Sequence, residues 1–381
     1  MKIKKIETFL VGNPWKTWIF IRLTTDDGFT GVSECTLNGF ALSVVQAINE
    51  LEPYYIDKDP HDIERITFDM FTKMFSRGGM IHKSAISAIE VACWDIIAKH
   101  AGVPIWKLIG GRFNEKLLCY ANGWYRHERT PENFAKSSKK VADMGYKALK
   151  FDPFGEVTGV ITIKDINESM EIIEAVRDSV GKDVELLIEG HGRFTVDSAI
   201  RISKEIQRFN PMLFEEPLAP DNYEGLIEVS KKSPVPIATG ERFYAIEVWA
   251  NLLSKGALQI AQPDIINSGG ISHAKKVAAI AEAYGVGVAP HNPQGPISTA
   301  ICVGFGTSLP NFAVQEVFDD FNEVWTKKLI TNPFNVVDGY LYPSEKPGIG
   351  VELIDEEISK HISKGSEMLN LFEKGWERRK D

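Results

Sequence analysis

The sequence predicts an α/β protein in which a TIM-type barrel of parallel strands follows a smaller α+β unit. Its 381 residues are enough for two or three domains. After residue 115, eight short apolar runs alternate with amphipathic helical stretches, which is the pattern of parallel strands joined by helices. Polar residues also recur at the ends of these runs at even intervals. Eight such units in about 200 residues match the size of a barrel, and this match predicts the fold.

The composition argues against two classes of function. The chain has 43 basic and 52 acidic residues, a net charge of −9 and no long cluster of Lys and Arg, so nucleic-acid binding is not expected. No run approaches the roughly 18 apolar residues of a membrane span. The four cysteines are scattered without a CxxC pair, as in proteins of a reducing compartment. We therefore expect a cytoplasmic protein that acts on a small molecule and binds neither nucleic acid nor membrane.

The first unit combines strands with helices. Residues 1–35 alternate in strand fashion around an Asp26-Asp27-Gly28 turn, which is a strong hairpin signal. Residues 84–102 have apolar side chains at helical spacing, with Ser84 as the expected N-cap and Gly102 as the expected stop. This text predicts an α+β unit.

The barrel is predicted from a change in the sequence pattern at residue 116, where short apolar runs begin to alternate with amphipathic stretches. Its eight apolar runs read KLLCYANGW, KALKFDP, VELLIEGHG, PMLFEEP, VPIATGER, LQIAQPD, GVGVAPHN and FAVQEVF. Residues 320–381 become irregular and polar again. We therefore expect an α+β domain over 1–115, a barrel over 116–319, and a segment over 320–381 that returns to pack on the first domain.

Polar residues stand at the C-terminal ends of the apolar runs. From Glu189 to Glu316, one follows another every 23 to 27 residues, about the length of one strand-helix unit. Equal spacing places them on one rim, the end of such a barrel where active sites are built. The residues in this position are Lys150, Asp152, Glu189, His191, Glu215, Glu241, Asp264, His291 and Glu316.

Three carboxylates on successive strands indicate a cation site. Glu189, Glu215 and Glu241 would repel one another strongly in a dry barrel mouth. All-oxygen ligation points to Mg²⁺, or Mn²⁺, as the ion that relieves this repulsion. A single glutamate is more typically a solvated surface charge, but three in register favour the metal site.

Two of the eight histidines carry features of acid–base groups. His291 ends a strongly apolar run, and Asp264 on the neighbouring strand is placed to hydrogen-bond its ring, as a general base requires. His191 lies two residues after Glu189, so strand alternation aims both into the mouth. Lys150 is costly inside a barrel unless it meets an anion; the alternative is a lysine that extends from the strand end to solvent.

These motifs together resemble those of a known family. K-x-[KD], E-x-H-G-R, F-E-E-P, G-E-R, Q-P-D and P-H-N on consecutive strands resemble the enolase superfamily, mandelate racemase and muconate lactonizing branch, over essentially the whole chain. Residues 84–111 resemble the segment that joins that family's capping domain to its barrel. The resemblance implies a (β/α)7β barrel with an α+β capping domain built from the N-terminal segment and the C-terminal tail. YANGWY and IEGHGRF are most similar to the acid-sugar dehydratases, the archaeal gluconate/galactonate dehydratases in particular.

The resemblance also implies roles for the rim residues. His291, held by Asp264, would remove the proton α to the substrate carboxylate, and His191 would protonate the leaving 3-hydroxyl. Lys150 and Glu316 would contact the substrate carboxylate and the enolate oxygens. The implied Mg²⁺ ligands are Glu189, Glu215 and Glu241, and our candidate substrate contacts are Arg193, Asp152, Lys16 and Trp124. Trp15, Lys16 and Trp18 are candidate lid residues, although Trp18 is equally well explained as a buried strand residue.

One departure from the family pattern narrows the reaction. Racemases of the family carry K-x-K on the second strand, whereas this chain has Asp152 in place of the second lysine. A site with one base and one acid suits β-elimination. We therefore expect a homo-oligomeric, Mg²⁺-dependent enzyme that dehydrates D-gluconate or D-galactonate through an enolate to the 2-keto-3-deoxy acid. The alternatives are another aldonate dehydratase (arabinonate, xylonate or fuconate), an acid-sugar epimerase and, more remotely, a non-catalytic barrel.

Overall fold

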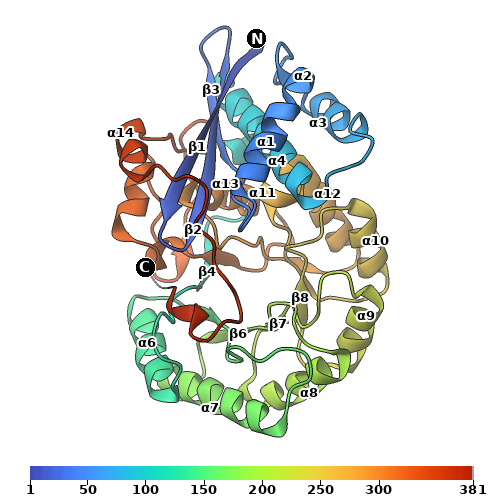
Figure 1. Cartoon of the computed structure of the whole chain (residues 1–381), viewed down its shortest axis with the longest axis vertical. Coiled ribbons are helices and arrows are strands. Elements are labelled where there is room, and N and C mark those ends of the chain that lie inside the picture. Colours follow the sequence, from blue (N-terminus) through green and yellow to red (C-terminus); the bar gives the residue numbers. More distant parts are fainter. Residues whose placement is uncertain (380–381) are drawn as a thin grey trace.

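Eight parallel strands form a ring that is enclosed by helices, and a small antiparallel sheet with its own helices lies beside the ring (Figure 1). The computed structural model describes residues 1–379. Within this range no helix combines the length and the apolar character that crossing a membrane requires. The ring of parallel strands and the separate antiparallel sheet confirm the predicted combination of a barrel and an α+β capping unit.

The capping sheet is an antiparallel meander. Alternating apolar residues bury one face of its strands against the helices that follow, and Gly28 (φ +89°) completes the predicted turn between the second and third strands. The elements are β1 (Ile3–Asn13), β2 (Lys16–Thr25), β3 (Thr30–Glu34), α1 (Ala41–Glu50), α2 (Glu52–Tyr55) and α3 (Ile63–Thr72). Trp18 is fully buried in β2, so it is a strand residue.

Helix α4 (Gly79–His100) connects the cap to the barrel, because it packs on β3 and α1 on one side and on α11 and α12 on the other. The expected N-cap was wrong: the helix starts five residues earlier, and Ser84 is buried in its second turn. Its hydroxyl bonds Met80 O at 2.9 Å and Asn267 Oδ1 at 2.7 Å, so it serves contact with the barrel. Gly102, at φ +68°, follows the last turn as expected.

The barrel strands pair in parallel in the order β10-β9-β8-β7-β6-β5-β4-β11. Val288 closes the ring, because its N–H bonds Asn311 O and its carbonyl accepts from Ala313 N, both at 2.8 Å. The strands are β4 (Leu117–Ala121), β5 (Ala148–Phe151), β6 (Glu185–Glu189), β7 (Leu213–Glu215), β8 (Ile237–Thr239), β9 (Ile260–Ala261), β10 (Gly287–Val288) and β11 (Gln315–Val317).

Seven helical connections join these eight strands, which is the expected (β/α)7β arrangement. The helices are α6 (Pro131–Asp143), α7 (Ile163–Val180), α8 (Val196–Ile206), α9 (Tyr223–Lys232), α10 (Ile246–Ser254), α11 (Ile265–Ser268), α12 (Gly270–Ala283) and α13 (Pro296–Thr307). Short elements complete the chain: α5 (Ile105–Leu108), β12 (Tyr340–Leu341), α14 (Asp355–Ile358) and the 3₁₀ turns η1 (Gln207–Phe209), η2 (Asp319–Phe321), η3 (Val324–Leu329), η4 (Ser359–His361) and η5 (Trp376–Arg378).

One apolar layer fills the barrel interior, with one side chain from each strand or from the residue next to its end. Its members are Tyr120, Ala148, Leu187, Leu213, Ala238, Ile260, Ala289 and Val314. Because side chains alternate along a strand, the next inward position is two residues further on. That position holds Asn122, Lys150, Glu189, Glu215, Gly240, Gln262, His291 and Glu316. The layer above the apolar layer is therefore polar, at the C-terminal end of the strands.

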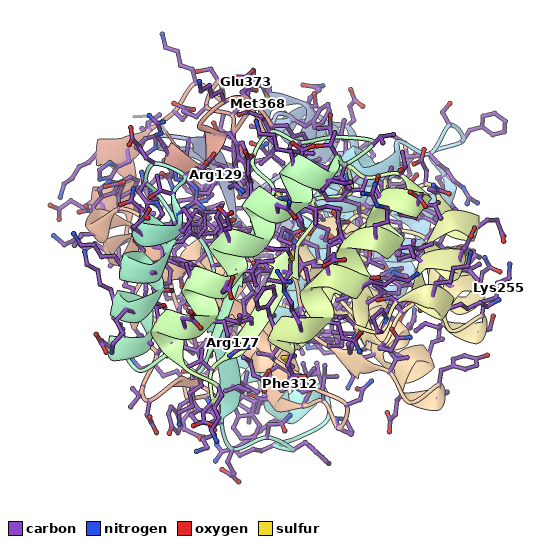
Figure 2. All side chains as sticks on the ribbon, turned by 90° about the horizontal axis from the view of Figure 1, so that it is seen from below. Arg129, Arg177, Lys255, Phe312, Met368 and Glu373 are labelled. Atoms are coloured by element: carbon purple, nitrogen blue, oxygen red, sulfur yellow. The ribbon has the colours of Figure 1, made fainter. Side chains whose placement is uncertain are left out.

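After β11 the chain returns to the cap and then crosses the barrel mouth. Ser363 N bonds Leu10 O at 2.8 Å, and Asn38 exchanges two hydrogen bonds with the backbone of Leu369. In Figure 2, Met368 and Glu373 lie at the same end of the barrel as Arg129, while Phe312 lies at the opposite end. The return of the tail is thus observed, and the exact boundaries at 115/116 and 319/320 stay a prediction.

Candidate active site

A cavity of about 500 Å³ lies at the C-terminal end of the barrel, beneath the cap and the C-terminal segment. Seven of the residues predicted from the sequence line it: Lys16, Lys150, Glu189, His191, Glu241, Asp264 and His291. Five others lie behind this lining: Asp152, Glu215, Glu316, Arg193 and Trp124. The side chains that line it therefore come from β2 and from the C-terminal ends of five barrel strands, β5, β6, β8, β9 and β10.

Lys150 lies at the centre of a buried carboxylate cluster. Its Nζ lies 3.2 Å from Glu189 Oε2 and 3.1 Å from Glu316 Oε1, and it bonds the Glu215 carboxylate as well. Burial lowers the pKa of Lys150, but the surrounding carboxylates, Glu215 first, hold it well above the usual range. One cation thus faces three acidic side chains, and the lysine does not extend to solvent.

Neutral donors hold the cluster in place, and sequence reasoning did not assign them. Asn122 Nδ2 donates to Glu316 Oε1 at 2.7 Å, and Asn292 N donates to the other oxygen at 2.6 Å. Gln262 Nε2 donates to Glu215 Oε2 at 2.7 Å. The signal that could have found Asn122 and Gln262 is their spacing, two residues beyond the apolar layer.

His291 and Asp264 form the expected pair. The ring Nδ1 lies 2.8 Å from Asp264 Oδ2, and this carboxylate also accepts from Ile266 N and Asn267 Nδ2, each at 3.1 Å. The other ring nitrogen, Nε2, faces the cavity 3.1 Å from Glu241 Oε2. Burial lowers the pKa of His291, yet the charge of Glu241 and the bond to Asp264 raise it to about 10. Neutralising the charge of Glu241 would remove the largest of the effects that raise the pKa of this ring.

His191 has a matching partner in Asp152. Its Nδ1 lies 2.7 Å from Asp152 Oδ2, and its backbone is left-handed (φ 49°), which turns the ring across the mouth. Arg193 grips the same carboxylate with both Nη atoms, at 2.6 and 2.9 Å. Burial works against ionisation of Asp152, but Arg193 and His191 hold its pKa well below the usual range. Burial lowers the pKa of His191, and Glu189 and Asp152 more than compensate, so the pKa of the ring lies above its ordinary value.

The remaining candidates for substrate contact differ in position. Asp152 and Arg193 lie behind His191, and Trp124 donates from Nε1 to Lys150 O at 2.9 Å, which fixes the end of β5. None of the three lines the cavity, and substrate contact through them stays a prediction. Lys16, in contrast, lines the cavity, and its Nζ bonds Gln294 Oε1 at 3.0 Å and Pro293 O at 3.2 Å.

The three glutamates fit a divalent cation by donor chemistry and by charge. Glu189 and Glu215 are register partners on neighbouring strands. Burial and the charge of Glu189 raise the pKa of Glu215 well above the usual range, a repulsion that a cation would relieve. Within residues 1–379, however, no three acidic, His or Cys side chains surround one point, because Glu241 lies against His291. Glu241 follows Gly240 and so lies one residue beyond the inward layer.

Comparison with known proteins identifies the family to which this chain belongs. The family model for the enolase C-terminal domain-like fold matches residues 133–358, and that for the mandelate racemase/muconate lactonizing enzyme N-terminal domain matches residues 10–110. The chain belongs to the enolase superfamily, in its mandelate racemase branch. In this superfamily member, the polar rim residues from Lys150 to Glu316 all lie within the matched C-terminal domain.

Curated relatives and solved structures agree with this membership. A D-gluconate/D-galactonate dehydratase of Picrophilus torridus is 35% identical over 98% of this chain and 97% of its own, and a D-gluconate dehydratase of Thermoproteus tenax is 35% identical over 93% and 72%. A mandelate racemase/muconate lactonizing enzyme from Jannaschia has a TM-score of 0.90 at 32% identity, covering 96% of this chain and 99% of that one. These relatives and the superfamily membership support a hydro-lyase, an enzyme that removes water.

Proposed function

We propose that the protein dehydrates a sugar acid of the D-gluconate or D-galactonate type to its 2-keto-3-deoxy acid. One observation carries the proposal: two histidines, each held by a buried aspartate, line the same cavity as Lys150. A base and an acid on different strands suit removal of a proton at C2 and departure of the hydroxyl at C3. The dehydratase relatives support the same substrate class.

The side chains divide the reaction between them. His291 Nε2 takes the C2 proton, and the electron pair of that bond moves into the carboxylate to give the enolate. His191 then gives its proton to the 3-hydroxyl, which leaves as water while a C2–C3 double bond forms. The resulting enol tautomerises to the 2-keto-3-deoxy acid. Lys150 supplies positive charge where the enolate develops it, and Glu316 orients Lys150.

Glu189, Glu215 and Glu241 would hold the divalent cation, Mg²⁺ or Mn²⁺. A proton α to a carboxylate is only weakly acidic, and the cation supplies Lewis-acid stabilisation of the negative charge that its removal creates. The charge excess around Lys150 and the oxygen-only donor set support this assignment.

The decisive test is a panel of aldonates incubated with the protein and Mg²⁺ and assayed for 2-keto-3-deoxy product. We expect turnover of D-gluconate or D-galactonate, loss of activity on chelation with EDTA and its return with added Mg²⁺. Turnover confined to arabinonate, xylonate or fuconate would show that the protein is a dehydratase of another aldonate. Deuterium from solvent at C2, with inversion there and no loss of the 3-hydroxyl, would establish an epimerase and contradict the proposal.

A further inference from the structure

The C-terminal segment forms one wall of the active-site cavity. Leu369, Leu371, Trp376 and Arg379 line it, although they lie more than 50 residues beyond the last barrel strand. Trp376 anchors the wall, because its Nε1 donates to Gly155 O at 3.2 Å and its ring stands edge-on to that of His191 at 5.4 Å. In Figure 1 this segment, in red, crosses from the capping sheet to the barrel strands.

Arg379 is a buried cation that forms no ion pair with a carboxylate of residues 1–379. Its side chain lies against the rings of Trp15 and Phe318, with Cζ 4.7 and 4.4 Å from their centroids. Arg379 is 5% exposed, its one hydrogen bond within residues 1–379 runs from Nη1 to Gly123 O at 3.3 Å, and its buried Nε has no partner there. Burial lowers the pKa of Arg379 to about 9, which reflects the cost of this position.

Lys16 places a second such cation beside it. Its Nζ lies 4.8 Å from the centroid of the same Trp15 ring, and its hydrogen bonds to the described residues go to neutral oxygens only. Burial and the charge of Arg379 lower the pKa of Lys16 to about 8. These two buried cations share one indole, and no carboxylate in the described part of the chain is hydrogen-bonded to either. Such a pair is costly unless a ligand supplies oxygen atoms to it.

The two cations reach the cavity from other elements than the catalytic groups of the rim do. Lys150, His191 and His291 project from the barrel strands, whereas Lys16 and Arg379 project from β2 and from the C-terminal segment. A substrate whose carboxylate lies near Lys150 therefore extends its other end toward the cap. In a six-carbon sugar acid that end carries hydroxyl oxygens.

We propose that Arg379 is a substrate-binding residue which, together with Lys16, binds the terminal hydroxyl oxygens of a six-carbon sugar acid and so selects for chain length. This inference rests on the proposed function for the class of substrate. The C-terminal segment then contributes a specificity-determining residue to a site whose catalytic groups all come from the barrel. Charged hydrogen bonds of about 1.5–3 kcal/mol correspond to about 10- to 100-fold in affinity.

The test measures binding without turnover in full-length protein. In the His291→Asn background with Mg²⁺, calorimetric titrations compare D-gluconate and D-galactonate with glycerate, which lacks the remote end. We expect Arg379→Gln to weaken hexonate binding about 10- to 100-fold and glycerate binding less than about threefold. Arg379→Lys, which keeps the charge but loses the planar fork, should fall between. Arg378→Gln is the matched control, because Arg378 is exposed, and it should change neither.

Other outcomes overturn the proposal. Unchanged hexonate binding in Arg379→Gln, or an equal loss for hexonates and glycerate, would assign Arg379 a purely structural role. Absence of hexonate binding in the parent protein would also overturn the proposal, because there would be no bound substrate end for Arg379 to contact. Failure of the proposed function is seen separately, as hexonate binding that persists in a wild-type protein that forms no 2-keto-3-deoxy acid.

Discussion

At the scale of single residues, the two histidines share one design and differ in their surroundings. Each ring is held through Nδ1 by a buried aspartate, which leaves Nε2 directed at the cavity. Asp264 is held by neutral amide donors, whereas Asp152 is held by the Arg193 guanidinium. Arg193 thus lies behind the aspartate that holds His191, whereas Glu241 lies beside His291 on the cavity side. The two rings therefore have different electrostatic surroundings.

Replacing His291 by Asn should abolish dehydration, since the proposal assigns removal of the C2 proton to this ring. General-base removal costs about 10²- to 10⁴-fold in rate. The three glutamates are unaltered, so calorimetric Mg²⁺ affinity should stay within about threefold of wild type, well short of the 10- to 100-fold that altered metal sites lose. Full activity in this variant would show that the base has been assigned to the wrong residue.

Replacing His191 by Asn should separate the two halves of the reaction. Dehydration should fall about 10²- to 10⁴-fold, because the leaving hydroxyl has no proton donor. Exchange of the C2 proton with deuterated solvent, followed by NMR, should continue because His291 is intact. Asp152→Asn should act in the same direction and less strongly.

His61→Asn provides the control for this pair. His61 also pairs with an aspartate, Asp59, at 2.7 Å, but it lies on the surface with 42% of its side chain exposed. Its loss should change neither rate. A parallel loss of exchange and dehydration in His191→Asn would contradict the division of roles.

The rim residues were predictable from the sequence because strand alternation repeats over eight units. Lys150, Glu189 and His291 each follow the apolar layer by two residues, and spacing alone places them on one rim. Arg379 carried no such signal, since it lies in an irregular segment whose position depends on tertiary contacts. The sequence also did not indicate how deeply Arg193 is buried. We expected it to contact substrate, and only 3% of its side chain is exposed.

At the scale of elements, two glutamates of the cap hold the starts of two barrel helices. Glu90 in α4 accepts from Ile271 N and Ser272 N in the first turn of α12, both at 2.8 Å. Glu34 at the end of β3 accepts from Gly295 N at 2.8 Å and Ser298 N at 3.0 Å, at the start of α13. Carboxylates are stabilised at helix N-termini, so these contacts join cap and barrel.

Gly270→Ala should destabilise the protein more than an ordinary substitution at positive φ. Gly270 has φ +88°, and an added Cβ would lie 2.0 Å from Glu90 Oε2, which two backbone N–H groups hold in place. Strain of about 1–2 kcal/mol and loss of a charged hydrogen bond of about 1.5–3 kcal/mol both apply. Urea unfolding should show the sum.

The matched control is Gly285→Ala. Gly285 has φ +68° with no atom within 4 Å of the added Cβ, so only the strain applies. Equal losses in the two variants would show that the contact with Glu90 has no role in stability.

Element boundaries were harder to predict than element types. The helical period of α4 was evident from the sequence, yet its start was not, because Ser84 looks like an N-cap wherever an apolar period follows it. Its true role depends on Asn267, which lies 183 positions away. The close approach of Glu90 to Gly270 likewise depends on tertiary contacts that the local sequence does not contain.

At the scale of the whole molecule, the interface between cap and barrel contains two buried acids, Glu34 and Glu90, that form no ion pair within residues 1–379. Burial raises the pKa of Glu34 and of Glu90 to about 7 each, against an ordinary value of 4.5, although hydrogen bonds to both lower it. The active site lies at this same interface, since Lys16 and Arg379 reach the cavity from the cap side. The protonation of Glu34 and Glu90 therefore affects the contact between cap and barrel that encloses the site, which we call the joint.

Stability across this joint should fall as the pH rises from 4.5 to beyond 7. A folded pKa above the unfolded one means that the native state binds the proton more tightly. The stability gained is fully present below pH 4.5 and is lost as the pH passes 7. The unfolding free energy of wild type, minus that of Glu90→Gln, should therefore decrease between pH 4.5 and 8.5 by up to about 3 kcal/mol. Urea unfolding at four pH values measures this difference, with exposed Glu373→Gln as a control that shows no trend. A difference that rises with pH would mean that the helix N-terminus outweighs burial and keeps Glu90 ionised.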